Sequence, residues 1–272
     1  MLNPPEVAGS IGVYDSGVGG LSILRALRAR LPGESFTYVA DCGHAPYGDR
    51  PAPFVENRAR SVARFLAEQG AKALVIACNT ASVVAARSLR ELHTLPIVAM
   101  EPAIKPAVQV SRSKVVLVLA TSTTIHSPSV ARLCSTHGAD TRIILQACPG
   151  LADQVERGRF HDPVTQQLLE TCLRPGLDAG ADTIVLGCTH YAFLARAIAA
   201  LAGPDVTIVE PSEAIASQLS RVLAASPANG RNLAGNTVFF TSGPPHELAA
   251  FLEHIGEPAT PVFALPALVS QR

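Results

Sequence analysis

AKALVIACNT, residues 71–80, and its near copy ADTIVLGCTH, residues 181–190, decide the fold of this chain. Each copy follows a glycine, and Cys78 and Cys188 hold the same position in the two copies. A run of about four to eight apolar residues between turn signals predicts a buried strand. An unbroken apolar run is typical of a parallel strand with helices on both faces. Ligands of open α/β sheets bind at the carboxyl ends of the strands, so the repeat places two thiols where chemistry is expected.

The composition indicates a folded chain with sizeable cores. The chain has 272 residues, of which 48% are apolar and 16% charged, and this length suits two domains of about 100–150 residues each. The formal net charge is zero, which argues against a broad binding surface for nucleic acid or an anionic membrane. We therefore expect neither as a partner.

The distribution of apolar and sulfur-containing residues predicts a cytoplasmic protein. No apolar run reaches the roughly 18 residues of a membrane-spanning helix. Residues 1–10 lack the pattern of a secretory signal and are interpreted as a leader before the first strand. Six cysteines without a CxxC pair predict reduced thiols inside the cell rather than a disulfide framework.

Strands and helices alternate along the chain, which predicts parallel sheets with right-handed crossovers. The expected strands cover residues 11–14, 35–41, 71–80, 95–100, 141–148, 181–190, 206–212 and 236–243, and residues 113–124 are expected to form a strand followed by a small polar loop. The expected helices cover residues 21–31, 54–69, 81–93, 127–138, 163–180, 193–201, 213–225 and 246–255, and another begins near residue 149.

The internal repeat predicts two pseudo-symmetric αβ domains of the α/β class, with parallel central sheets and the active site in the cleft between them. Residues 1–100 together with 210–272 are expected to form the first domain, and residues 101–209 the second. The last segment returns to the first domain because the repeat of the second half ends near residue 210.

Each repeated cysteine is expected at the start of a helix. Asn79, Thr80 and Thr189 are residue types that cap helix N-termini. At such a position the helix dipole and free N–H groups lower the pKa of a thiol from about 8.5 toward neutrality. The same N–H groups bind carboxylates. A small acid held between two thiols could lose a proton from one face of a carbon and gain one on the other.

The alternative for any one cysteine is that of a small buried hydrophobic residue. The matched position of Cys78 and Cys188 favours a functional role for this pair. The remaining four cysteines are expected to be structural or incidental; they are Cys42, Cys134, Cys148 and Cys172.

Three further motifs supply polar residues. DSGVGG, residues 15–20, lacks the third glycine of a dinucleotide-binding loop, and no GK[ST] follows it, so nucleotide binding is disfavoured. Asp15 and Ser16 are expected to point into the same cleft as Cys78. His190 is a candidate proton partner of Cys188, with a polar helix-start residue as the alternative. No second ligand pair accompanies them, so a zinc site is not expected. The PYG of residues 46–48 is either a surface turn or part of a functional loop.

DSGVGGLS, PYG, VIACNTA and VLGCTHY, in this order, resemble the glutamate racemase family of the cofactor-independent amino-acid racemase superfamily. The resemblance extends from about Ile11 to Phe240. It implies an isomerase that interconverts L- and D-glutamate without a cofactor and supplies D-glutamate for peptidoglycan and the cell wall. It also implies glutamate as the ligand and a homodimer.

The resemblance implies roles for individual residues. Cys78 and Cys188 would be the two acid/base groups, and Cys78 would act on D-glutamate. Glu156 would be the partner of His190. The implied substrate-binding residues are Asp15, Ser16, Tyr47, Gly48, Asn79, Thr80, Thr121, Thr124, Thr189 and His190.

Three other functions are weighed against this one. The first is a racemase acting on aspartate or a hydantoin. The second is a cysteine hydrolase that uses Cys188 and His190, which would release a product rather than invert a centre. The third is a regulatory protein that binds DNA gyrase, and a supercoiling assay would detect it.

Overall fold

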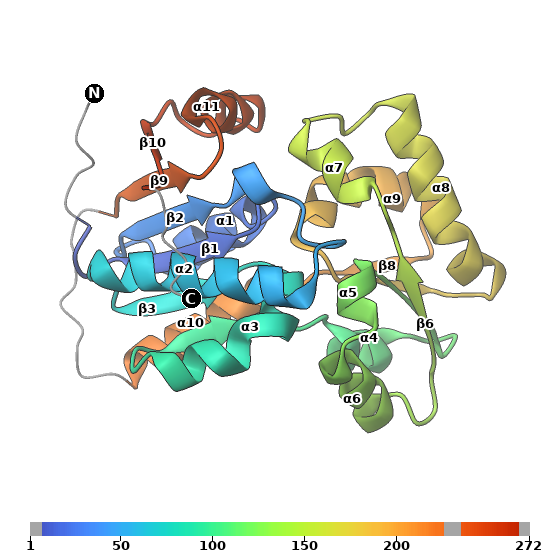
Figure 1. Cartoon of the computed structure of the whole chain (residues 1–272). Coiled ribbons are helices and arrows are strands. Elements are labelled where there is room, and N and C mark those ends of the chain that lie inside the picture. Colours follow the sequence, from blue (N-terminus) through green and yellow to red (C-terminus); the bar gives the residue numbers. More distant parts are fainter. Residues whose placement is uncertain (1–6, 226–234, 267–272) are drawn as a thin grey trace.

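Two parallel sheets organise the chain, and each forms the centre of one lobe (Figure 1). The computed structural model describes residues 7–225 and 235–266, so the first six residues of the expected leader lie outside the described residues. The strand order is β10-β9-β2-β1-β3-β4 in one sheet and β6-β5-β7-β8 in the other. The predicted α/β fold with two parallel sheets is confirmed.

The strands of the first sheet come from both ends of the chain. They are β1 (Ile11–Asp15), β2 (Phe36–Ala40), β3 (Ala73–Ile76), β4 (Ile97–Ala99), β9 (Thr237–Thr241) and β10 (Val262–Ala264). The strands of the second sheet are β5 (Val115–Ala120), β6 (Arg142–Ala147), β7 (Thr183–Leu186) and β8 (Thr207–Val209). Every residue of β1, β2, β3 and β7 is buried, as expected for parallel strands that helices cover on both faces.

Helices pack around both sheets (Figure 1). The first lobe carries α1 (Leu21–Arg30), the 3₁₀ turn η1 (Cys42–His44), α2 (Ala52–Glu68), α3 (Asn79–Leu92), α10 (Ser212–Ala224) and α11 (Pro245–His254). The second lobe carries α4 (Ile104–Val110), α5 (Ser122–Ile125), α6 (Pro128–His137), α7 (Leu151–Glu156), α8 (Pro163–Asp178), the 3₁₀ helix η2 (Thr189–Leu194) and α9 (Ala195–Ala202). Helix α10 packs on α1, so the chain has returned to the first lobe after β8. The division of domains at residues 100 and 210 stays a prediction.

The two cysteine strands occupy equivalent places in the sheets. β3 pairs with β1, and β7 pairs with β5, the strand that opens the second half. Tyr14 is in register with Ile76, so the chain leaves β1 toward Asp15 at the same edge where it leaves β3 toward Cys78. The sheet register therefore brings the DSGVGG motif beside the first thiol.

Some elements differ from the prediction. Helix α4 and strand β10 were not expected; α4 carries Pro106 in its first turn, where the missing N–H costs no helical hydrogen bond. Helix α2 begins at Ala52, two residues before the expected start at residue 54, and Pro51 is its N-cap. Helix α3 begins at Asn79, ahead of the expected residue 81. Among the described residues no helix is long and apolar enough to cross a bilayer.

Candidate active site

Cys78 and Cys188 lie at the carboxyl ends of β3 and β7, one in each lobe. Cys78 is the N-cap of α3, and its Sγ accepts a hydrogen bond from the Ala81 backbone N–H at 3.4 Å. Cys188 is the N-cap of η2, and its side chain makes no capping bond. The two residues are 5% and 7% exposed. Each lobe thus contributes one nearly buried thiol from a matching position.

Asp15 and Ser16 connect the two thiol-bearing segments. The Cys78 thiol donates to Ser16 Oγ at 3.5 Å. Asp15 Oδ2 accepts from the Thr189 hydroxyl at 3.1 Å, across the boundary between the lobes. Two consecutive residues of the DSGVGG loop therefore reach both cysteine segments, and the charge of Cys188 acts on the Cys78 thiol, so the two thiols lie near each other.

Burial controls the proton affinity of Cys78. Loss of solvent raises the pKa of the Cys78 thiol to about 12, and the charges of Asp15 and Cys188 act in the same direction. The bonds from Ser16 and the Ala81 N–H oppose this rise only in part. The expectation of a thiol pKa near neutrality is therefore wrong for Cys78. The helix N-terminus is present, but desolvation of the thiolate is the larger effect.

Asp15 is a wholly buried carboxyl group that titrates near neutrality. Burial raises its pKa from 3.8 to about 6, although the positive charge of His190 and the N–H of Gly17 favour the carboxylate. The Gly17 N–H donates to Asp15 Oδ1 at 2.8 Å. An ionised Asp15 beside the Cys78 thiol is a group to which a proton can be transferred.

We expect Asp15→Asn to stabilise the fold at neutral pH. A carboxyl group whose pKa is higher in the folded state than in the unfolded state binds more protons in the folded state. Asp15 therefore lowers the free energy of unfolding progressively as the pH rises from about 4 to 6. The gain is roughly 1–3 kcal/mol at pH 8 and vanishes near pH 4. Urea unfolding at the two pH values measures it, with the exposed Asp178→Asn as control. Equal stability of wild type and Asp15→Asn at pH 8 would contradict the expectation.

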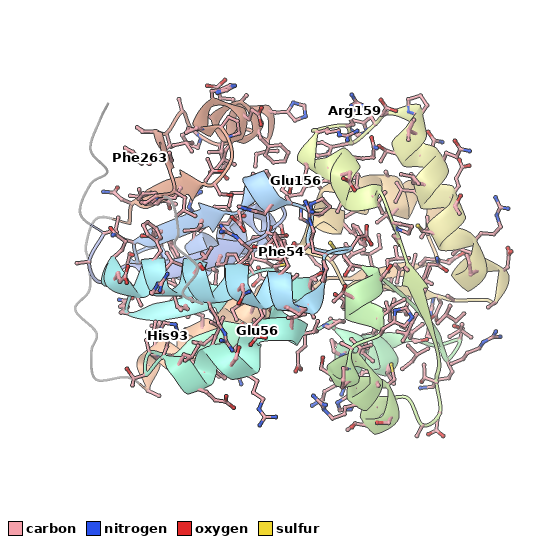
Figure 2. The ribbon with its side chains drawn as sticks, in the orientation of Figure 1. Phe54, Glu56, His93, Glu156, Arg159 and Phe263 are labelled. Carbon is pink, nitrogen blue, oxygen red and sulfur yellow. The ribbon has the colours of Figure 1, made fainter. Side chains whose placement is uncertain are left out.

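His190 and Glu156 support the second thiol. His190 Nδ1 lies 3.7 Å from Cys188 Sγ, and His190 Nε2 lies 2.5 Å from Glu156 Oε1. Burial opposes the charged ring, but these two contacts raise the pKa of His190 well above its ordinary value. A charged imidazole stabilises a thiolate on Cys188 and can return its proton. Figure 2 shows Glu156 where the two lobes meet.

The glycines of DSGVGG allow the loop to approach residues of the second lobe closely. A Cβ on Gly17 would lie 1.9 Å from Glu156 Oε1, and a Cβ on Gly19 would lie 2.4 Å from His190 Nδ1. The backbone of Val18 also donates to Glu156 Oε1 at 2.9 Å. Glycine leaves room here for the loop to pack directly on the residues behind Cys188, which are the His190 ring and Thr189 at Gly19 and the end of the Glu156 side chain at Gly17.

Hydroxyl groups from both lobes meet at the start of α3, close to Cys78 in the chain. Thr80 Oγ1 lies 2.9 Å from Thr121 Oγ1, and Thr121 donates to Thr124 Oγ1 at 2.9 Å. Asn79 is 2% exposed, yet neither its Oδ1 nor its Nδ2 has a hydrogen-bond partner. A buried amide without partners is a group that a polar ligand can satisfy.

Tyr47 and Gly48 lie beside this cluster in the loop between η1 and α2. The Tyr47 hydroxyl donates to Asp41, and it accepts from Tyr14 at 2.9 Å, so the phenol is occupied within the first lobe. The Gly48 carbonyl accepts from the Thr123 hydroxyl of the second lobe at 2.8 Å. Thr123 is a contact residue that was not predicted. Within the described chain no group of three or more His, Cys, Asp or Glu side chains is arranged to hold a metal ion.

Comparison with known proteins identifies the family. Residues 22–219 match the Asp/Glu/hydantoin racemase family. The chain belongs to this family. The glutamate racemase of Methylococcus capsulatus is 51% identical over 235 residues, which cover 86% of this chain and 87% of that protein. The glutamate racemase of Pseudomonas putida is 46% identical over 248 residues, which cover 91% and 94%.

Solved structures of Asp/Glu/hydantoin racemases have the same fold. Glutamate racemase RacE1 of Bacillus anthracis aligns with a TM-score of 0.86 at 31% identity, covering 97% of this chain and 99% of its own. The Escherichia coli enzyme, in complex with L-glutamate and the activator UDP-MurNAc-Ala, aligns at 0.85 and 28% identity, covering 95% and 98%. An aspartate racemase of Picrophilus torridus aligns at only 0.53 and 14% identity, covering 80% and 94%, and shares the fold alone.

Proposed function

We propose that this chain is a glutamate racemase that interconverts L- and D-glutamate without a cofactor. The observation that carries the proposal is the pair of thiols at matching strand ends in opposing lobes, with Asp15 and Ser16 reaching both segments. Membership of the racemase family supports the type of reaction. Relatives at 46–51% identity, which are glutamate racemases, support glutamate rather than aspartate or a hydantoin as substrate.

The reaction needs one ionised sulfur and one protonated sulfur. The thiolate removes the Cα proton, so the Cα–H bond breaks, an S–H bond forms and the electron pair stays on the carbon. The opposite thiol then donates its proton to the other face and becomes the thiolate. Each proton transfer changes the charge that the other sulfur experiences, and the charge of Cys188 raises the pKa of the Cys78 thiol. Each such group contributes roughly 10²–10⁴-fold to the rate.

The two sulfurs reach the ionised state by different routes. The Cys78 thiol has a high pKa and needs a nearby base, for which Asp15 is the candidate, because a carboxyl group with a pKa of about 6 is largely ionised at neutral pH. Cys188 has His190 within 3.7 Å, and Glu156 holds the ring from behind. The rest of the reduction in the barrier must come from dipoles that stabilise the negative charge developing on Cα.

Polar groups around the first thiol are the candidates for binding the substrate carboxylates. They are the unpartnered amide of Asn79, the hydroxyls of Thr80, Thr121 and Thr124, and the backbone N–H groups of Asn79 and Thr80 at the start of α3. Ser16, Thr189 and the Tyr47–Gly48 loop complete the proposed binding residues. We also propose that the protein is cytoplasmic and supplies D-glutamate for peptidoglycan. We propose that it is a homodimer, and sedimentation velocity would test this.

A circular-dichroism assay tests the function. Purified protein in the presence of EDTA, with no added cofactor, should reduce the signal of D-glutamate to zero as a racemic mixture forms, and L-glutamate should behave in the same way. D-aspartate is the control substrate and should keep its signal. Stable glutamate signals, or faster loss with aspartate, would exclude the proposed substrate.

A further inference from the structure

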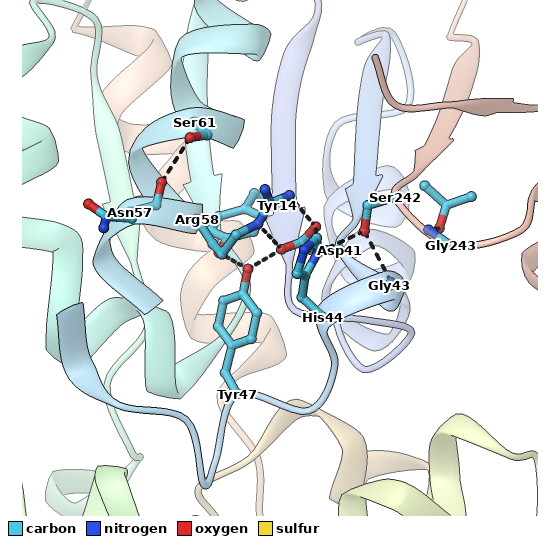
Figure 3. Close-up of polar contacts among 11 residues, drawn as sticks. Tyr14, Asp41, Gly43, His44, Tyr47, Asn57, Arg58, Ser61, Ser242 and Gly243 are labelled. Carbon is cyan, nitrogen blue, oxygen red and sulfur yellow. Dashed lines mark hydrogen bonds and ion pairs between the residues drawn. The ribbon is translucent and has the colours of Figure 1, made fainter. Parts of the chain in front are cut away.

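A buried carboxylate with no place in the proton transfer lies at the end of β2. Asp41 is wholly buried, and four side chains surround its carboxylate: Arg58, Tyr47, His44 and Ser242 (Figure 3). Its backbone N–H donates to the carbonyl of Asp15 at 3.0 Å. The group is therefore fixed directly behind the DSGVGG loop but outside the thiol pair.

Arg58 of α2 neutralises this carboxylate through two parallel bonds. Its Nε lies 2.9 Å from Asp41 Oδ2, and its Nη2 lies 2.7 Å from Asp41 Oδ1. Burial alone would raise the pKa of Asp41, but the bond and charge of Arg58 hold that pKa below its ordinary value. The side chain of Arg58 is only 13% exposed. A paired guanidinium of this geometry sets direction as well as charge.

The ionised Asp41 in turn holds the loop that follows η1. The Tyr47 hydroxyl donates to Asp41 Oδ2, and Figure 3 shows this bond beside the Arg58 contacts. Tyr47 is 1% exposed, so its ring is packed as well as hydrogen-bonded. Gly48, the next residue, accepts from Thr123 at 2.8 Å, and its backbone lies against the side chain of Thr121.

A continuous set of contacts thus runs from α2 to the binding threonines of the other lobe. We propose that Arg58 is a positioning residue for substrate binding: through Asp41 and Tyr47 it fixes the loop of residues 45–48 against Thr121 and Thr123. This inference rests on the proposed racemase function. Arg58 does not touch the reacting atoms, so its loss should weaken binding more than it slows the proton transfer.

Arg58→Gln tests the proposal, with Arg60→Gln as the matched control. Arg60 lies on the same helix, its side chain is 47% exposed, and it pairs with Glu56 one turn earlier. Removing Arg58 takes the guanidinium charge and its two bonds away from the buried Asp41 carboxylate, which is strongly unfavourable even though Tyr47, His44 and Ser242 remain beside it. We expect the KM for glutamate to rise about tenfold or more in Arg58→Gln while kcat falls less than about threefold. Arg58→Lys restores the charge but not both bonds and should recover part of the KM.

A double-mutant cycle separates positioning from a general loss of stability. If Arg58 acts through Tyr47, the effects of Arg58→Gln and Tyr47→Phe on KM are not additive in the double variant. Hydrogen exchange of residues 42–50 should be faster in Arg58→Gln than in wild type or Arg60→Gln. Additive effects on KM, or loop exchange equal to the control, would overturn the proposal. If Arg58→Gln does not fold, Arg58→Lys and Tyr47→Phe provide the same two readouts.

These measurements distinguish the two proposals. A wild-type protein that does not racemise glutamate refutes the proposed function, and the exchange data still decide whether Arg58 fixes the loop. A wild-type protein that racemises glutamate, with Arg58→Gln kinetics equal to those of Arg60→Gln, refutes only the positioning role.

Discussion

Cys78→Ala and Cys188→Ala should each abolish racemisation of glutamate while the fold remains intact. Inversion needs a proton acceptor on one face of Cα and a donor on the other, and neither variant retains both. We expect losses of roughly 10²–10⁴-fold or more in kcat. Cys134→Ala is the control, because this partly exposed cysteine lies on α6, away from the proposed site.

The two variants should differ from each other in deuterium exchange. In Cys188→Ala the remaining Cys78 can remove a proton from one face and return a deuteron to the same face, which exchanges one enantiomer without inverting it. Cys78→Ala should exchange the opposite enantiomer. The resemblance assigns D-glutamate to Cys78, so we expect D-glutamate to exchange in Cys188→Ala. Mass spectrometry in D₂O measures exchange, and racemisation within tenfold of wild type in either variant would refute the two-thiol mechanism.

The features that were predicted correctly come from local patterns. The strands at residues 73–76 and 183–186 are short apolar runs next to glycines, and their repetition is visible without any knowledge of tertiary contacts. Parallel pairing then follows from the alternation of strands and helices. The same repeat also predicted that Cys78 and Cys188 follow equivalent strands, and β3 and β7 do occupy equivalent places in their sheets.

The features that were missed depend on contacts between distant parts of the chain. The pKa of Cys78 is set by burial and by Asp15, and neither effect can be read from the residues next to the cysteine. Arg58 looks like an ordinary polar residue of a helix until Asp41 is found opposite it. Strand β10 has three residues and joins the edge of the sheet beside β9, which is too little pattern for a prediction.

At Gly17 and Gly19 too, the need for a small residue comes from contacts with residues far along the chain. Neither glycine has a positive φ angle, so the backbone conformation alone does not require glycine. What excludes a side chain is the close approach of Glu156 to Gly17 and of His190 and Thr189 to Gly19. A methyl group at either position must displace the residues that support Cys188.

We therefore expect Gly17→Ala and Gly19→Ala to lower kcat about 100-fold or more, because a displacement of about 1 Å in a catalytic group has effects of this size. Gly33→Ala is the matched control, since a Cβ on Gly33 meets nothing within 4 Å. Turnover of both loop variants at the level of Gly33→Ala would mean that His190 and Glu156 can move without consequence for Cys188.

The damage should be confined to one half of the reaction. The new methyl groups press on the residues behind Cys188, whereas the Cys78 thiol is held by Ser16 and the Ala81 N–H from within its own lobe. Exchange of D-glutamate with D₂O should therefore survive in Gly19→Ala, while exchange of L-glutamate falls together with racemisation. Equal loss of both exchange reactions would show that the loop serves the two thiols alike, and that Asp15 and Ser16 move with the glycines that follow them.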